Sequence, residues 1–67
     1  MRVSSSNLYS VGYDPTSQVL EIEFRGGEVY RYFGVPMGVY SALMSARSKG
    51  SYFARVIRDT YSYALVA

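Results

Sequence analysis

The stretch VLEIEFRGGEVYRY, residues 19–32, decides the fold of this chain. Apolar side chains alternate with charged ones through residues 19–25, which is the period of an antiparallel strand with one buried face and one wet face. Gly26-Gly27 then supplies a turn, and Tyr30-Arg31-Tyr32 resumes the alternation with an arginine between two aromatic rings. The stretch therefore predicts a β-hairpin whose two strands share an apolar face.

The length of the loop between these strands decides which face the tyrosines occupy, because a shift of one residue turns every following side chain over. A two-residue loop at residues 26–27 pairs Ile22 with Arg31 and forces the arginine onto the apolar face. A three-residue loop at residues 25–27, ending in a left-handed glycine, pairs Ile22 with Tyr30 and places Arg31 among glutamates. We favour the three-residue loop.

Two shorter patterns bracket this hairpin. Residues 9–13 read Tyr, Ser, Val, Gly, Tyr and lead into Asp14-Pro15-Thr16-Ser17, in which the proline occupies the second turn position. Val35-Pro36 ends the third strand, because proline donates no hydrogen bond to a ladder and fits the first turn of a helix. These boundaries predict a three-stranded antiparallel meander.

The C-terminal half changes to helical spacing. Apolar residues recur at intervals of three and four, which predicts one helix over about residues 36–46 and a second short helix that Ser48 is able to cap. Residues 61–65 alternate again and suit a strand at a sheet edge, either within one chain or between two chains. The expected fold class is α+β: a three-stranded meander packed against two short C-terminal helices, with room for an extra edge strand. Residues 1–67 are expected to form one domain.

The composition argues against several kinds of chemistry. The 67-residue chain has no cysteine and no histidine, so it offers no disulfide, no thiolate or imidazole metal ligand and no Cys or His nucleophile. Its carboxylates show no paired arrangement suited to acid-base catalysis. No apolar run approaches the roughly 20 residues that cross a bilayer, and the N-terminus lacks the apolar region of a signal peptide. We expect a non-enzymatic, cytoplasmic protein with no membrane association, metal or cofactor.

Size and charge both bear on partners. A domain this small buries little apolar surface, and self-association is a common way to bury more, so a homo-oligomer stays open. Residues 1–30 carry two basic and four acidic side chains, whereas residues 31–67 carry five basic and one acidic. Six of the seven basic residues are arginine, whose guanidinium makes bidentate contacts with phosphates and stacks on bases. An anionic partner at the C-terminal half is one expectation, and a merely solvated surface is the alternative.

Basic side chains gather around the expected second helix, beside a serine hydroxyl and a tyrosine ring. Arg55 and Arg58 are three residues apart and are expected to share a helical face, and Ser51 with the free amides of the helix start adds anion-binding groups. The candidate site for nucleic acid or another anionic ligand comprises Arg47, Lys49, Ser51, Tyr52, Arg55 and Arg58. The alternative is a solvated helix face in which Asp59 pairs with Arg55.

Two other groups of residues have competing interpretations. Tyr30 and Tyr32 either stack on bases or, sharing a face with the apolar residues of the preceding strand, belong to the core with their hydroxyls at its periphery. The preferred register favours the core. Ser4-Ser5-Ser6 and Asn7 either hydrogen-bond a ligand or form a capped, frayed terminus, and the terminus is the favoured interpretation.

Several motifs, taken together, resemble those of a known family. They are Ser4-Ser5-Ser6, Gly12-Tyr13-Asp14, the central Tyr30-Arg31-Tyr32, Gly34-Val35-Pro36, Ser48-Lys49-Gly50, Tyr52-Phe53 and Ile57-Arg58. The chain resembles the KTSC family, a short domain found at the C-terminus of some lysyl-tRNA synthetases and also as a stand-alone bacterial or phage protein. The resemblance implies RNA binding through that context alone.

The leading functional hypothesis is a non-enzymatic RNA-binding module that uses the basic helix surface and tyrosines. One alternative is a small homo-oligomer that binds an anionic, nucleotide-like ligand in pockets between protomers. The other is a protein-interaction module, for example a phage factor acting on a host protein, that docks through the sheet face or residues 61–65.

Overall fold

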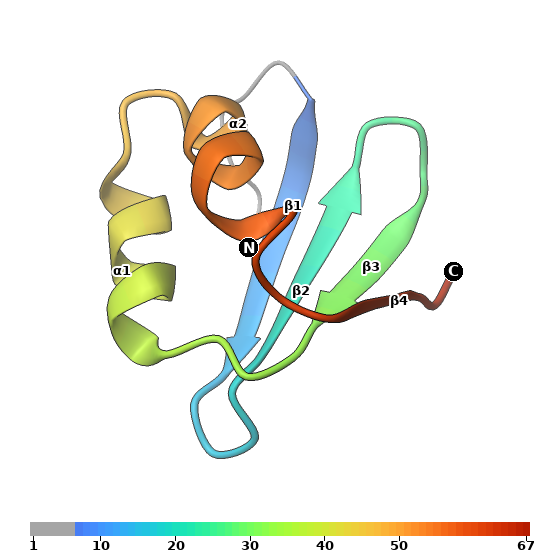
Figure 1. Cartoon of the computed structure of the whole chain (residues 1–67). Helices are drawn as coiled ribbons and strands as arrows, with labels where there is room; N and C mark the ends of the chain where they lie inside the picture. The colour runs from blue at the N-terminus through green and yellow to red at the C-terminus, as the bar shows by residue number, and fades with distance from the viewer. Residues whose placement is uncertain (1–6) are drawn as a thin grey trace.

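The computed structural model describes residues 7–67 as a four-stranded antiparallel sheet with helical segments on one side of it (Figure 1). The strands lie side by side in chain order and are β1 (Leu8–Asp14), β2 (Val19–Phe24), β3 (Val29–Tyr32) and β4 (Tyr63–Leu65). The helical segments are α1 (Met37–Ser45), α2 (Lys49–Tyr52) and the π-helical turn η1 (Phe53–Ile57). The predicted α+β class is confirmed. The serines at positions 4–6, proposed above as a ligand-binding or capping run, lie outside the described residues.

The central hairpin has the register that the three-residue loop predicts. Ile22 lies opposite Tyr30, and Leu20 lies opposite Tyr32. Gly27 closes the loop with a φ of 98°, in the left-handed region that glycine enters without a steric penalty. The hairpin prediction is therefore confirmed down to the pairing of individual residues.

The third strand ends earlier than the sequence suggested. β3 stops at Tyr32, because Gly34 takes a positive φ of 70° and turns the chain away from the sheet. The Val35 side chain is fully buried in the core, and the Val35 carbonyl oxygen accepts a hydrogen bond from the Tyr13 hydroxyl at 2.6 Å. The prediction that Val35-Pro36 ends the strand was wrong by three residues, since the turn at Gly34 comes before the proline in the chain.

The C-terminal segment completes the sheet within one chain. β4 runs antiparallel to β3, with Arg31 opposite Ala64 and Tyr32 opposite Tyr63. Within residues 7–67, β4 therefore has β3 as its one neighbour in the sheet and occupies one edge, while β1 occupies the other. Of the two pairings that the sequence left open, the structure shows the one within the chain.

One core fills the space between the sheet and the helical segments. Its buried members are Leu8, Val11, Leu20, Ile22, Tyr32, Val35, Leu43, Phe53 and Ile57. They come from β1, β2, β3, α1, η1 and the loop before α1, so the helices and the sheet stabilise each other. Burial of each large apolar side chain contributes roughly 1.5–3 kcal/mol.

The second helix begins where predicted but changes its pitch. Ser48 caps it, because the Ser48 Oγ accepts a hydrogen bond from the backbone N–H of Ser51 at 3.2 Å. In η1 the N–H of Arg58 donates to the carbonyl of Phe53 at 2.9 Å, one residue further back than in an α-helix. This extra residue changes which side chains lie above one another. Within residues 7–67, no helix is long and apolar enough to cross a membrane.

Candidate functional site

A hollow of about 340 Å³ lies at the uncovered part of the helix-side face of the sheet. Its walls are the aromatic rings of Phe24, Tyr30, Tyr32, Phe53 and Tyr63, and the rest of its lining is Ala54 with the polar side chains of Asn7, Arg58 and Asp59. We name it the aromatic hollow. It combines apolar ring surfaces with one cation, Arg58, and one carboxylate, Asp59, so a planar ligand with an anionic group would contact the rings and Arg58.

The sheet register brings these rings together. Tyr30 and Tyr32 point to the same face because they are two residues apart in β3, and Tyr63 faces them from the neighbouring strand. The Tyr63 ring centroid lies 5.6 Å from that of Tyr30 and 5.6 Å from that of Tyr32. The Tyr32 ring meets Phe53 edge-on at 5.4 Å, so η1 closes one wall of the hollow.

The three tyrosines of the aromatic hollow differ in how far they are exposed. Tyr32 is 3% exposed and belongs to the core, whereas Tyr63 is 59% exposed and Tyr30 is half-buried between them. The structure therefore places Tyr32 in the buried wall of the hollow, as the preferred register implied. Tyr63, with part of Tyr30, offers the ring surface that a ligand can reach.

Burial, the neighbouring phenols, Arg58 and Asp59 all act on the ionisation of Tyr32 in the hollow. Burial raises the pKa of Tyr32 to about 12; the neighbouring phenols of Tyr30 and Tyr63 add to the rise, while the charge of Arg58 opposes it. The Tyr32 hydroxyl is consequently a neutral group at physiological pH. Arg58 itself is half-exposed, and its Nε lies 3.8 Å from the Asp59 carboxylate, too far for a strong charge-assisted hydrogen bond.

The basic residues predicted to cluster around the second helix do not form one site, because they contact different parts of the structure. The guanidinium carbon of Arg55 lies 5.9 Å from the ring centroid of Tyr52, within cation–π range. Arg58 lines the aromatic hollow instead. The predicted pairing of Asp59 with Arg55 is wrong. In the π-helical turn η1, residues four apart no longer lie one turn above each other, and the Asp59 carboxylate lies beside Arg58 instead.

The start of the second helix offers less to an anion than the sequence suggested. The N–H of Ser51 is already donated to the cap, and Lys49 Nζ donates to the carbonyl of Ala46 at 3.3 Å. α2 has only 4 residues before the pitch changes, so little helix dipole builds up there. Arg47 is exposed and free of the hollow's lining. Arg47 and Lys49 therefore add positive charge to this surface but do not line a pocket for an anion.

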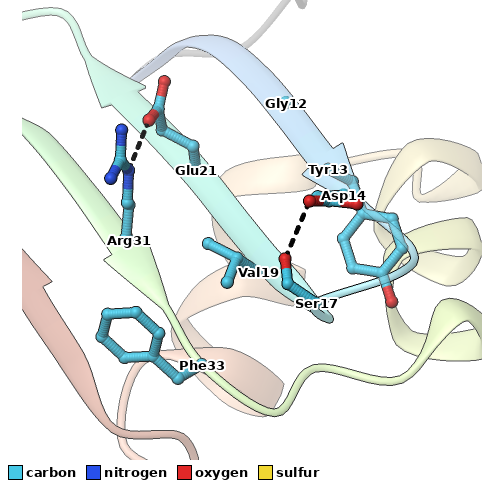
Figure 2. A pocket seen from close by; sticks show the side chains of 8 residues that line it. All are labelled: Gly12, Tyr13, Asp14, Ser17, Val19, Glu21, Arg31 and Phe33. Carbon is cyan, nitrogen blue, oxygen red and sulfur yellow. Dashed lines mark hydrogen bonds and ion pairs between the residues drawn. The ribbon is translucent and has the colours of Figure 1, made fainter.

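A second hollow, of about 400 Å³, lies on the opposite face of the sheet (Figure 2). Gly12, Glu21 and Arg31 form a row across β1, β2 and β3, and the missing side chain of Gly12 leaves open space at one end. Arg31 Nε donates to Glu21 Oε2 at 2.9 Å, as the favoured register predicted, and Phe33 lies further along the same side of the sheet. Arg31 and Glu21 therefore compensate each other's charge in this outer hollow.

Asp14, at the rim of the outer hollow, is also satisfied within the chain. Its carboxylate accepts hydrogen bonds from the Thr16 N–H at 3.0 Å and from the Ser17 hydroxyl at 2.9 Å. The Ser17 hydrogen bond, followed by that of Thr16, lowers the pKa of Asp14 below its usual value. This carboxylate fixes the turn between β1 and β2. In the described part of the chain, no group of three His, Cys, Asp or Glu side chains is placed to hold a metal ion.

The KTSC domain model matches residues 4–61 of the chain. The chain belongs to the KTSC domain family. A KTSC domain protein from Yersinia pestis, known from a crystal structure, is 42% identical and superimposes with a TM-score of 0.97 over 100% of this chain and 94% of that one. The resemblance seen in the sequence motifs is thus confirmed.

Other relatives match this chain over most of their own length or over a small part of it. An uncharacterized protein of Stutzerimonas stutzeri is 48% identical over 59 residues, which are 88% of this chain and 83% of that protein. A lysine–tRNA ligase of a Nostoc species is 38% identical over 63 residues, which are 94% of this chain but 11% of the ligase. The domain is therefore a small part of the ligases that it matches.

Sequence reasoning did not group the residues of the aromatic hollow in this KTSC domain. Phe24 and Phe53 read as core positions, and Tyr63 read only as part of an edge strand. What joins them is the pairing of β4 with β3, which brings Tyr63 against Tyr32. The alternation of residues 61–65 indicated a strand but carried no signal for its partner.

Proposed function

We propose that this KTSC domain is a non-enzymatic module that binds single-stranded RNA. In this proposal a base stacks against Tyr63 and Tyr30 at the mouth of the aromatic hollow, and Arg58 contacts the adjacent phosphate. The observation that carries the proposal is the accessible tyrosine ring beside an accessible arginine at one hollow. Stacking on aromatic side chains combined with positive charge is the usual chemistry of single-strand binding.

The dimensions of the hollow favour one base over a larger ligand. Its volume of about 340 Å³ falls at the lower end of the range of small-molecule sites, which is roughly 300–1,000 Å³. A double helix has no exposed base that could enter such a space. A flexible single strand can turn one base into it while the flanking phosphates remain at the surface.

Arg58 is suited to a phosphate because its present partner holds it weakly. The 3.8 Å separation from Asp59 and the half-exposed side chain describe a surface ion pair, which contributes about 0–1 kcal/mol. A phosphate can replace this contact at little cost. Arg47, Lys49 and Arg55 lie in the same C-terminal half and would add salt-dependent, sequence-independent attraction.

The relatives add context to this proposal. Some are lysine–tRNA ligases, proteins whose name states that they act on tRNA, and the KTSC domain accompanies that activity as about a tenth of the chain. Attachment to an RNA-acting enzyme supports an RNA-binding role, without saying which nucleotides are bound.

The second candidate ligand is a free nucleotide bound in the same hollow. The volume of the hollow, about 340 Å³, is suited to a single nucleotide. The two are distinguished by titrating a fluorescein-labelled single-stranded RNA octamer while following anisotropy, then competing with a nucleoside monophosphate. Binding of the octamer with weak competition by the mononucleotide supports the RNA module. Equal competition per nucleotide supports the free-ligand alternative. If neither ligand binds at low salt, both proposals for the hollow fail, and a protein-interaction role becomes the hypothesis to pursue.

A further inference from the structure

The exposed edge of β4 is unlike the other edge of the sheet. The β1 edge carries a register shift between Leu8 and Ser10, and such bulges discourage a foreign strand from adding to an edge. The pairing of β4 with β3 is regular over Tyr63–Leu65, and the chain bulges only beyond it, where Val66 and Ala67 both lie opposite Val29. Residues 61–67 contain no charged side chain and no proline. Charges, prolines, bulges and short strands are the devices that protect an edge, and of these β4 has only its length of 3 residues and the bulge beyond its end, so it leaves a short, uncharged edge open to one strand of matching length.

Apolar side chains extend along this edge. Tyr63 is 59% exposed, Leu65 is 58% exposed and Val66 is 43% exposed. Tyr63 and Leu65 point to the helix side of the sheet, since they pair with Tyr32 and Tyr30, but the helices do not cover them. The edge therefore offers both a backbone and an uncovered apolar strip.

The backbone hydrogen-bond pattern shows which groups face outward. Phe33 N–H donates to the carbonyl of Ser62 at 2.9 Å, and Val66 N–H donates to the carbonyl of Val29 at 2.8 Å. Residues 62 and 66 thus turn their backbone groups toward β3. Because alternate residues of an antiparallel strand bond to opposite sides, the backbone groups of Tyr63 and Leu65 are expected to point away from β3.

We propose that β4 pairs with β4 of a second copy of this chain, antiparallel and about a two-fold axis at Ala64. Tyr63 and Leu65 lie symmetrically on either side of Ala64, so this axis places Tyr63 of each copy opposite Leu65 of the other. All the outward-facing N–H and C=O groups of the two residues then find partners, and the two sheets become one continuous sheet. Pairing about a two-fold axis requires a self-complementary surface, and this edge is one.

The side chains also suit a second copy better than an unrelated strand. On the helix side, each Tyr63 ring lies against a Leu65 side chain, an aromatic–aliphatic cross-strand pair of the kind that stabilises sheets. On the outer side, two Ala64 methyl groups face each other without crowding. Arg31, opposite Ala64 in β3, is already paired with Glu21, so the nearest charges of the two copies are compensated. Leu65 of the second copy would also border the aromatic hollow beside Tyr63. This inference does not depend on RNA binding.

Cysteine cross-linking tests the axis directly, because the chain has no cysteine of its own. In the proposed pairing, the two Ala64 residues form a non-hydrogen-bonded pair with Cα atoms roughly 4.5 Å apart, within reach of a disulfide. Ala64→Cys treated with a mild thiol oxidant is expected to form a covalent dimer quickly. Met37→Cys on α1, where the native side chain is 50% exposed, is the matched control and should cross-link only slowly. Equal cross-linking rates for the two variants would overturn the proposal.

Sedimentation of the otherwise unmodified chain provides the second measurement. The interface is short, so we expect a reversible dimer in the micromolar to millimolar range of dissociation constants. Leu65→Lys should abolish it, and Met37→Lys, which adds the same charge at a similarly exposed site, should not. Circular dichroism verifies that both variants fold. A wild-type monomer at concentrations up to roughly 1 mM, or a dimer that Leu65→Lys leaves intact, contradicts the proposed interface.

Discussion

Tyr32 and Tyr63 lie opposite each other on β3 and β4, with their ring centroids 5.6 Å apart. Tyr32 is buried in the core and Tyr63 is largely exposed, so the contact between their rings runs from the core to the surface. Strand pairing thus builds the aromatic hollow from a core residue and an edge residue. The predictions below follow from that arrangement.

Replacing Tyr63 should weaken RNA binding without unfolding the protein. Base stacking on an aromatic ring contributes about 1–3 kcal/mol, so Tyr63→Ala is expected to reduce affinity for a single-stranded octamer roughly 5-fold to 150-fold. Phe33→Ala removes another exposed ring, on the outer face, and should leave affinity unchanged. Fluorescence anisotropy measures both. Equal losses for the two variants would remove the hollow from consideration as the stacking site.

Arg58 should act through charge at the hollow. Arg58→Gln is expected to lower affinity at low salt and to flatten the slope of log affinity against log salt by about 0.7, the value for one single-strand phosphate contact. Arg47→Gln makes the same change in net charge away from the hollow and should have a smaller effect on affinity. Titrations at several salt concentrations measure the slopes. An identical response of the two variants would indicate general attraction without a placed phosphate contact.

The buried phenol of Tyr32 should make the fold sensitive to alkali. Its pKa is raised to about 12, so the folded state keeps a proton that the unfolded state releases above its ordinary pKa of about 10. Stability contributed by this group is complete below about pH 10 and is lost as the pH rises toward 12, by on the order of 2–3 kcal/mol.

Tyr32→Phe isolates that effect, because it keeps the buried ring and removes the titrating hydroxyl. Urea unfolding at about pH 8 and about pH 11 should show a smaller alkaline loss for this variant than for the wild type. The remaining tyrosines and the arginines are common to both proteins, so their contribution cancels in the comparison. Equal alkaline losses would show that Tyr32 ionises normally.

Two glycines of the sheet should respond differently to alanine. Gly27 has a φ of 98°, and an added Cβ meets no atom within 4 Å, so the cost of Gly27→Ala is conformational, about 1–2 kcal/mol. Gly12 also has open space around it but lies in extended backbone, so Gly12→Ala should be neutral or stabilising by about 0.5 kcal/mol. Thermal or urea unfolding compares them. A neutral Gly27→Ala would argue against the left-handed turn.

Local patterns in the sequence predicted the hairpin very well. The alternation in residues 19–25, the glycine pair and the Tyr-Arg-Tyr motif together left two registers, and burial of a charge ruled against one of them. Ile22 opposite Tyr30 and Arg31 beside Glu21 follow from that choice. Ser48 as a helix cap was likewise predictable, since the cap is a contact between residues three positions apart.

The candidate site was less predictable, because its parts depend on distant contacts and on a change of helical pitch. Spacing placed Arg55 and Arg58 on one α-helical face, but the π-helical turn directs Arg58 to the hollow and leaves Arg55 at Tyr52. No local pattern of side chains marks such a turn.

The sequence by itself determined the central hairpin with its register, the Ser48 cap of the second helix and membership of the KTSC family, since each of these rests on neighbouring residues or on recognisable motifs. Only the tertiary structure decided that the C-terminal strand pairs with β3 and that Tyr63 and Arg58 meet Tyr32 at one hollow. The physical reason is that alternation reports which face of a strand is buried, while the choice of partner depends on how the whole chain packs around its core.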